Sequence, residues 1–198
     1  PILPVHPDDL PSKKELREKL GLDNDSPFIF VPISGPVKER AYITGVLRNI
    51  LLDMPSEYQI VMSLGYPNYK GEPVRKGNVT IYGWVPNRFE YLKACDLVIS
   101  KAGHGTLTQS ISYGKPMILI PTPSHTEQLN NAYRLKELGV AEVLEQHFVN
   151  KETLLRTIQK MLNDDAYRRR MEEIHKDISN LNGLKTAVDT IMKAAEAH

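Results

Sequence analysis

The sequence predicts an α/β domain of the doubly wound, Rossmann-like class, in which a parallel sheet of about six strands has helices on both faces. Short apolar runs alternate along the chain with segments of helical periodicity. The runs are apolar at successive positions, as in parallel strands that are buried on both faces. The length of 198 residues also suits one domain of this class.

The chain opens with four prolines among its first eleven residues, which indicate an extended interdomain linker. Ser12 and Glu15 have the capping-box spacing, so a short helix should follow and end near Gly21. Apolar runs bounded by turn residues predict strands at 27–34, 58–64, 78–85, 97–100, 116–121 and 141–144. Pro32 lies inside the first of these strands and predicts a distortion near its end.

Helical periodicity predicts helices between the strands and after the last one, over residues 39–54, 87–95, 105–113, 125–138, 150–162, 164–179 and 183–197. Right-handed crossovers between the parallel strands then give the doubly wound arrangement. We therefore divide the chain into a linker and opening helix at 1–26, a sheet domain at 27–146, and a helical C-terminal tail at 147–198 that packs on the same domain.

The composition narrows the possible functions. Its 25 Lys and Arg balance 24 Asp and Glu, so there is no electrostatic reason to expect nucleic acid or an anionic membrane as a partner. Cys95 is the only cysteine, which excludes an internal disulfide, fits a reducing compartment and suggests buried packing. No run approaches the ~20 apolar residues of a membrane span, and no signal peptide is visible. Because the first residue is Pro1 rather than methionine, we expect an excerpt from a longer, cytoplasmic protein.

Two glycine-bearing segments follow predicted strands and offer phosphate sites. Ligands of doubly wound sheets bind beyond the carboxyl ends of the strands, where the strand order reverses. Ser34 and Gly35 follow the first strand, with Lys38 and Arg40 nearby. The second segment places a cation, two glycines, an imidazole and a hydroxyl at a helix start: Lys101, Gly103, His104, Gly105 and Thr106. Helix starts attract anions through free N–H groups and the helix dipole, so two of them suit a diphosphate.

A dinucleotide-binding fingerprint is the main alternative for the second segment, and it fits badly. Thr108 stands where a third glycine is needed, and no acidic residue closes the next strand to hold a ribose. Glu127 comes at nearly the right distance along the chain but lies beyond that strand, at a helix start. No spacing typical of metal ligands or of a nucleophile with its base occurs in the sequence.

Two further stretches favour a ligand with a base and a sugar. Trp84, the only tryptophan, follows a strand in GWVPN, where its ring can stack on a planar heterocycle; a place in the core is the alternative. A later helix start collects groups that suit sugar hydroxyls, namely His125, Glu127, Gln128 and Asn131.

Together, these segments resemble the C-terminal, donor-binding domain of GT-B fold glycosyltransferases that use nucleotide sugars. The similarity covers roughly residues 27–146 and is best in GWVPN and in LKACDLVISKAGHGTLTQSISYGKPMILIPTPSHTEQLNNA. These stretches look like the signature of the UDP-glycosyltransferases and of the bacterial enzyme that adds N-acetylglucosamine to a peptidoglycan lipid precursor. The order and spacing of the elements make this resemblance far more specific than a single glycine motif.

The resemblance implies a role for each matching residue. Trp84, Val85 and Pro86 would hold the base, usually uracil, and Gln109 the ribose. Glu127 and Gln128 would hold the hydroxyls of the donor sugar. The diphosphate would bind at Ser34, Gly35, Lys101, Gly103, His104, Gly105 and Thr106. Gln109 departs from the family pattern, where a glutamate accepts both ribose hydroxyls, and Pro36 departs from the small residues of the first loop.

The resemblance further implies an inverting, metal-independent transferase that needs no cofactor and takes a nucleotide sugar, a UDP-sugar above all, as its donor. The acceptor site and the catalytic base would belong to an N-terminal domain, so this chain would hold no catalytic residue and be inactive alone. A lipid acceptor would bring the whole protein to a membrane surface through that other half. Three alternatives stay open: a separate donor-binding subunit of a two-protein enzyme, a UDP-sugar epimerase, and a non-catalytic nucleotide-sugar sensor.

Overall fold

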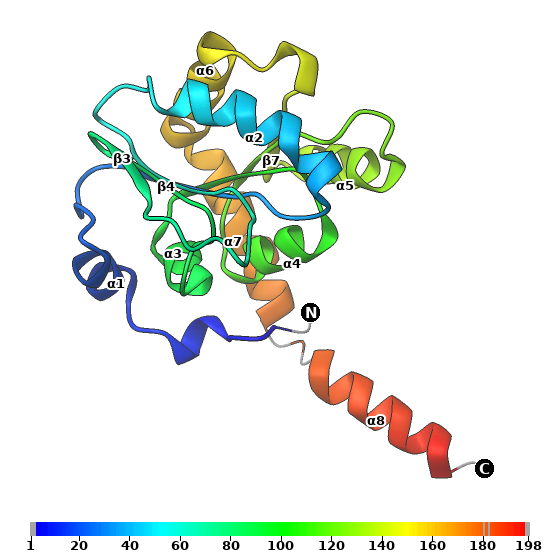
Figure 1. The fold of residues 1–198 in the computed structure, drawn as a ribbon. Coiled ribbons are helices and arrows are strands. Elements are labelled where there is room, and N and C mark those ends of the chain that lie inside the picture. The colour runs from blue at the N-terminus through cyan, green and yellow to red at the C-terminus, as the bar shows by residue number, and fades with distance from the viewer. Residues whose placement is uncertain (1–2, 180, 182, 197–198) are drawn as a thin grey trace.

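The computed structural model describes residues 3–179, 181 and 183–196. These residues form a seven-stranded sheet in the order β3-β4-β2-β1-β5-β6-β7, in which β3 is antiparallel to β4 and the other pairs are parallel. The strands are β1 (Phe28–Pro32), β2 (Gln59–Ser63), β3 (Val74–Lys76), β4 (Val79–Tyr82), β5 (Leu97–Ser100), β6 (Met117–Leu119) and β7 (Ala141–Val143). Helices lie on both faces of the sheet, so the predicted doubly wound α/β class is confirmed (Figure 1).

The strand order reverses between β1 and β5. From β1 the chain adds β2 and then β4 on one side, and it crosses back to place β5 against the other side of β1. β6 and β7 continue outward from β5. The carboxyl ends of β1 and β5 therefore flank the switch point, where doubly wound sheets bind their ligands.

Alternate side chains of β1 enter two separate cores. Ile29 and Val31 pack toward one face, together with buried residues of α2 (Val37–Leu51) and α6 (Lys151–Asn163). Phe28 and Phe30 pack toward the opposite face. Helices α1 (Lys13–Leu20), α3 (Arg88–Ala94), α4 (His104–Ser112), α5 (Thr126–Glu137) and α7 (Asp165–Ser179) contribute to that second core. A core on each face explains why the strands are apolar at successive positions.

The structure agrees with most of the predicted elements. Ser12 and Glu15 form the expected capping box, and α1 ends at Gly21 in the left-handed conformation. Pro32 is the last residue of β1, so the expected distortion coincides with the end of the strand. The strand count exceeds the predicted six because β3 was missed, and all three of its residues are exposed. Within the linker, Pro7–Asp9 form a 3-10 turn rather than the extended chain that the prolines suggest.

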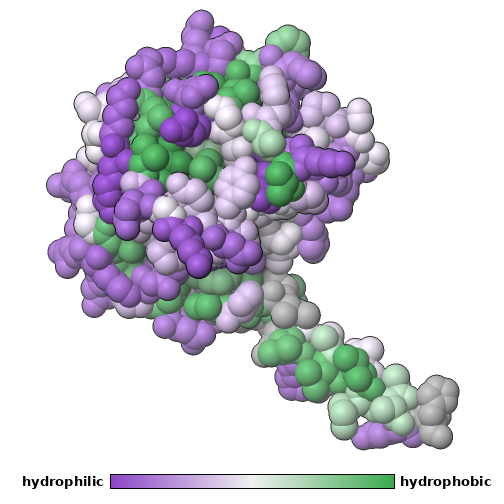
Figure 2. All heavy atoms as spheres, in the orientation of Figure 1, coloured by the Kyte–Doolittle hydropathy of each residue, from purple (hydrophilic) through white to green (hydrophobic). Residues whose placement is uncertain are grey.

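The C-terminal helices differ in how they pack. α6 and α7 bury residues such as Leu154 and Met171 in the two cores. By contrast, α8 (Gly183–Glu196) has no buried residue and extends away from the sheet in Figure 1. Its exposed apolar side chains, green in Figure 2, include Leu184, Val188, Ile191 and Met192. The expectation that the whole tail packs on the domain is therefore not met by α8, whose predicted last residue, 197, lies outside the described part of the chain.

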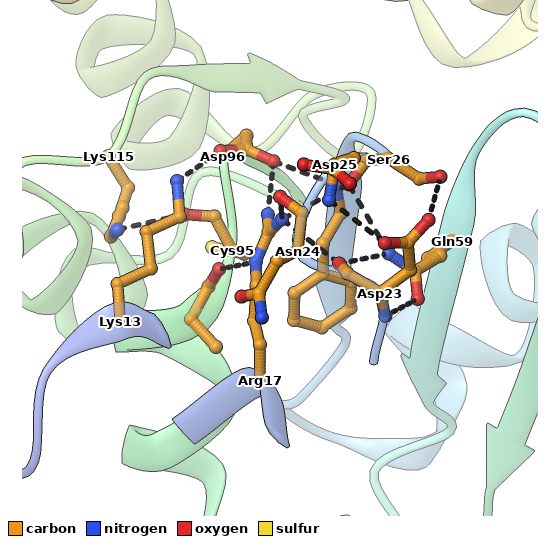
Figure 3. A network of polar contacts seen from close by, with 12 residues as sticks. Lys13, Arg17, Asp23, Asn24, Asp25, Ser26, Gln59, Cys95, Asp96 and Lys115 are labelled. Carbon is orange, nitrogen blue, oxygen red and sulfur yellow. Dashed lines mark hydrogen bonds and ion pairs between the residues drawn. The ribbon is translucent and has the colours of Figure 1, made fainter. Parts of the chain in front are cut away.

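A polar network fastens α1 to the amino ends of β1 and β5, at the edge of the sheet opposite the switch point (Figure 3). The Arg17 side chain is only 4% exposed, and its guanidinium donates to the Asp96 carboxylate at 2.5 Å. Asp96 also accepts from Lys13 and from the backbone N–H of Phe28. Further donors of Arg17 reach the backbone carbonyls of Asp23, Asn24, Ser26 and Ala94. The buried guanidinium thus has a charged partner and a full set of acceptors.

Candidate functional site

Two turns follow the strands that flank the switch point. Gly35 comes after β1 with a φ of 102°, a conformation that favours glycine. After β5, Ala102 has a φ of 65° and Gly103 is the N-cap of α4. Neither α2 nor α4 has a side chain that caps its first turn. The backbone N–H groups of both helix starts are therefore available to an anion.

These two turns and the start of α5 line a cavity of about 340 Å³. Its lining contains seven of the predicted site residues: Ser34, Gly35, Lys101, Gly103, Thr106, Glu127 and Gln128. The other residues of the lining are Pro32, Pro36, Glu39 and His125. His104 and Gly105, predicted for the diphosphate, lie exposed in the first turn of α4 outside this lining. The structure therefore brings the phosphate and sugar residues of the prediction together, those two excepted.

Lys101 lines this cavity and is its one lysine. Its side chain is only 6% exposed, and its Nζ lies 3.3 Å from Oε2 of Glu39. A Cβ placed on Gly35 would come within 3.5 Å of the same Nζ, so the ammonium lies between the two turns. Glu39 was not among the predicted site residues. Its position in the first turn of the helix after Gly35 was a usable signal, since that is where carboxylates interact with helix dipoles.

Arg40 holds the Gly35 turn through a hydrogen bond to its backbone. The residue is buried, and one of its terminal nitrogens donates to the Gly35 carbonyl. Its guanidinium carbon lies 4.4 Å from the centroid of the Tyr66 ring. Its Nε has no hydrogen-bond partner among the described residues. Arg40 therefore fixes the Gly35 turn and adds positive charge beneath it, whereas Lys38 stays exposed.

At the sugar end, the two predicted residues have different surroundings. Glu127 is exposed at the start of α5, and its carboxylate lies 3.5 Å from Nδ2 of Asn131. Gln128 is buried, and its carbonyl oxygen accepts from the backbone N–H of Thr122 at 2.9 Å. Glu127 is thus free to bind a hydroxyl, while Gln128 also holds the turn before α5. His125, the N-cap of α5, lines the cavity beside them.

The predicted base-binding stretch follows β4. Trp84 is 41% exposed and Val85 is buried. Both line a narrow cleft that shares Pro32 and Ser34 with the larger cavity, so the cleft and the cavity adjoin. Pro86 lies outside this lining. The indole is therefore accessible beside the cleft rather than placed in the core, and its stacking on a base stays a prediction.

Arg88 and Gln109 bridge α3 and α4 at the cleft. Nη2 of Arg88 donates to Oε1 of Gln109 at 2.7 Å, and Arg88 also lines the cleft next to Trp84. Burial lowers the pKa of the Arg88 guanidinium, and the described residues give it no carboxylate partner. The carbonyl oxygen of Gln109, expected to accept ribose hydroxyls, is thus already engaged. Arg88 was missed because its partner lies in another helix, 21 residues further along the chain.

No three His, Cys, Asp or Glu side chains in the described part of the chain are grouped so that they could hold a metal ion. None of the helices in residues 3–179 and 183–196 is long and apolar enough to cross a membrane.

Residues 27–191 match the glycosyltransferase family 28 C-terminal domain. The chain belongs to this family. The family 28 match covers the whole sheet and the helices from α2 to most of α8, and leaves out α1. It confirms the resemblance to the C-terminal domain of GT-B glycosyltransferases and places the chain among transferases.

Curated relatives support the same assignment. An uncharacterized glycosyltransferase from Methanosarcina mazei is 28% identical over 92% of this family 28 chain and 48% of its own length. The Lactobacillus acidophilus UDP-N-acetylglucosamine–N-acetylmuramyl-(pentapeptide) pyrophosphoryl-undecaprenol N-acetylglucosamine transferase is 27% identical over 98% of this chain and 53% of its own length. The chain thus spans about half the length of the curated relatives that it matches.

Solved structures share the fold of this family 28 domain. The spinosyn rhamnosyltransferase SpnG superposes with a TM-score of 0.71 at 19% identity, over 86% of this chain and 46% of its own. The glycosyltransferase VinC, solved in complex with dTDP, gives a TM-score of 0.70 at 19% identity, over 91% of this chain and 44% of its own. Both similarities lie in one half of a longer glycosyltransferase.

Proposed function

We propose that this domain binds the nucleotide-sugar donor of an inverting, metal-independent glycosyltransferase, and that the donor is a UDP-sugar. The observation that carries the proposal is the convergence of two uncapped helix starts on Lys101 at the switch point of the sheet. Backbone N–H groups and an enclosed ammonium are the groups that bind a diphosphate and stabilise it as it leaves.

Different parts of the donor would bind in the cavity and beside the adjoining cleft. The diphosphate would lie against Gly35, Gly103 and Lys101, with the hydroxyl of Thr106 in the same lining. The base would stack on the exposed ring of Trp84 beside the cleft, and the sugar would meet Glu127 at the start of α5. The ribose joins base and diphosphate, so it would pass the bridge between Arg88 and Gln109.

The chemistry of transfer needs a second surface. An acceptor hydroxyl attacks the anomeric carbon and loses its proton to a base, while the bond from that carbon to the diphosphate oxygen breaks with inversion. In this proposal the present domain holds the donor and stabilises the departing diphosphate. The acceptor site and the base belong to a further half, as the greater length of the relatives suggests. Alone, the domain would bind donors without transferring sugar, and contact with a lipid acceptor would be made by the other half.

The names of two similar glycosyltransferases support the choice of donor. The name of the Lactobacillus acidophilus relative specifies UDP-N-acetylglucosamine as its donor. VinC was solved with dTDP, a second pyrimidine nucleoside diphosphate. Both nucleotides pair a pyrimidine-2,4-dione with a diphosphate, which in this proposal bind at the exposed Trp84 ring and in the cavity.

Calorimetric titration of the 198-residue chain with UDP, ADP and dTDP tests the proposal. We expect UDP to bind with a Kd below about 1 mM, equivalent to about 4 kcal/mol, and more tightly than ADP. Gly103→Val should abolish binding without unfolding the domain, because the φ of Gly103 is −70° and an added Cβ meets nothing within 4 Å. Gly45→Val on α2 is the matched control, since its Cβ also meets no atom and the residue lies outside the cavity. Folded protein that binds none of the three nucleotides would contradict the proposal, as would UDP binding that survives Gly103→Val.

A further inference from the structure

We propose that Glu39 competes with the donor diphosphate for Lys101. The Glu39 carboxylate pairs with the Lys101 ammonium, and a diphosphate binds by displacing that carboxylate. This inference rests on the proposed function, and it concerns a residue to which the family resemblance gave no role.

The geometry places Glu39 where a phosphate would bind. Its Oε2 lies 3.3 Å from Nζ of Lys101, and both residues line the cavity. Glu39 is also in the first turn of α2, the helix start that would bind a phosphate in the proposed function. An ammonium and a helix start are the two features that attract a phosphate to this turn. Glu39 therefore holds the ammonium from within the turn that a phosphate would occupy.

The charges of the cavity indicate that this arrangement must change when a nucleotide binds. Lys101 is the one lysine of the lining, against the carboxylates of Glu39 and Glu127, with His125 counted as neutral. Arg40 adds a positive charge at the Gly35 turn, but the Lys101 ammonium stays paired with Glu39, so a diphosphate meets a carboxylate beside the ammonium that would bind it. Moving the Glu39 carboxylate away removes the nearest negative charge and frees Lys101 for the ligand.

The Glu39 side chain can move toward solvent, whereas the buried Lys101 ammonium needs a counter-charge. The Glu39 side chain is 33% exposed and can rotate toward solvent, whereas the Lys101 side chain is 6% exposed and cannot follow it. An enclosed ammonium without any counter-charge is strongly destabilising. Glu39 supplies that counter-charge until a phosphate does. The ion pair thus stabilises the folded domain, and a ligand that displaces Glu39 must bring a negative charge of its own.

This exchange makes a prediction about selectivity. Removing the Glu39 carboxylate should raise the affinity of a ligand in proportion to the negative charge that the ligand brings to Lys101. Glu39→Gln should therefore tighten UDP binding by about tenfold, tighten UMP binding less, and leave uridine unchanged. Inorganic pyrophosphate, which needs no base or sugar contact, should show the same gain as UDP.

Calorimetry on wild-type protein, Glu39→Gln and Glu152→Gln with these four ligands tests the inference. Glu152 is an exposed acid in the first turn of α6, so Glu152→Gln reproduces the loss of a helix-dipole contact away from the cavity and should change no affinity. Carbon-13 NMR adds a direct readout, because the Glu39 carboxylate signal should move when UDP is added to wild-type protein. Thermal unfolding of each variant shows whether the fold is kept.

The outcomes separate the two proposals. If wild-type protein binds UDP and Glu39→Gln changes that affinity by less than twofold, or weakens it, the inference is wrong and the proposed function stands. If pyrophosphate binds more tightly to Glu39→Gln but UDP binds no more tightly than pyrophosphate to either protein, the anion exchange is supported and the nucleotide assignment fails. If neither anion binds to either protein, both proposals are wrong.

Discussion

Among the described residues, Asp96 is the one carboxylate partner of the buried Arg17 guanidinium, so Asp96→Asn tests how much the network under α1 stabilises the domain. The substitution keeps a carbonyl oxygen that can accept from the Phe28 N–H, and it keeps the four carbonyl acceptors of Arg17. It removes the charge that compensates a guanidinium whose side chain is 4% exposed. Losing the partner of a buried charge costs about 3–5 kcal/mol, and the remaining acceptors place our expectation at about 3 kcal/mol.

The loss of stability caused by Asp96→Asn should be smaller at acidic pH than at pH 7. Burial alone would raise the pKa of the Asp96 carboxyl, but the charge and hydrogen bond of Lys13, the Phe28 N–H and Arg17 together lower it. A carboxyl with a lowered folded pKa stabilises the fold above its unfolded pKa of about 3.9 and loses that contribution as the pH falls through the folded pKa. The difference between wild type and Asp96→Asn should therefore be full at pH 7 and shrink below about pH 4.

Urea denaturation at several pH values measures both effects. The matched control is Asp53→Asn, which removes a carboxylate paired with Lys151 at 2.6 Å on an exposed surface and should leave the urea midpoint unchanged. A loss below about 1 kcal/mol for Asp96→Asn at pH 7, or a loss that grows on acidification, would refute the reasoning that Arg17 depends on a charged partner.

Three further predictions concern single positions. Burial raises the pKa of the Cys95 thiol to about 11, so thiol reagents at pH 8 should label the folded protein hardly at all and the urea-unfolded protein rapidly; rapid labelling of folded protein would contradict this. Gly45→Ala, at an exposed position inside α2 where a Cβ meets no atom, should stabilise the domain by about 0.5–1 kcal/mol in urea denaturation, and a loss of stability would count against it. Trp84 is the only tryptophan and is 41% exposed, so UDP should quench its fluorescence with the affinity found by calorimetry; binding without any spectral change would place the base elsewhere.

The sheet and its helices could be predicted because burial on two faces leaves a strong local pattern. Residues 28–32 are buried at every position, so their sequence is apolar throughout, and the helices between strands keep their periodicity. β3 could not be predicted in this way. Its three residues, Val74, Arg75 and Lys76, are exposed at the edge of the sheet, so no burial pattern marks them. Its pairing with β4 is a tertiary contact that leaves no local signal.

The residues of the candidate site that directly follow strands could be predicted from the sequence. Gly35 and Gly103 follow the two strands that flank the switch point, and topology alone brings such positions together. The charged partners could not be predicted, because they reach across elements. Lys101 meets Glu39 from 62 residues away, and Arg88 meets Gln109 from another helix. Each pairing depends on side-chain directions that sequence spacing does not specify.

The apolar surface of α8 has a consequence for local stability. A helix of 14 residues is marginal in water on its own, and most helices in proteins are stabilised by packing an apolar face. None of residues 183–196 is buried, so the rest of the domain adds little to the free energy that keeps α8 helical. Its amide hydrogens should exchange with deuterium orders of magnitude faster than those of α6, which buries Leu154 and Ile158 completely. Slower exchange in α8 on adding another protein would therefore report, residue by residue, which part of this helix that protein covers.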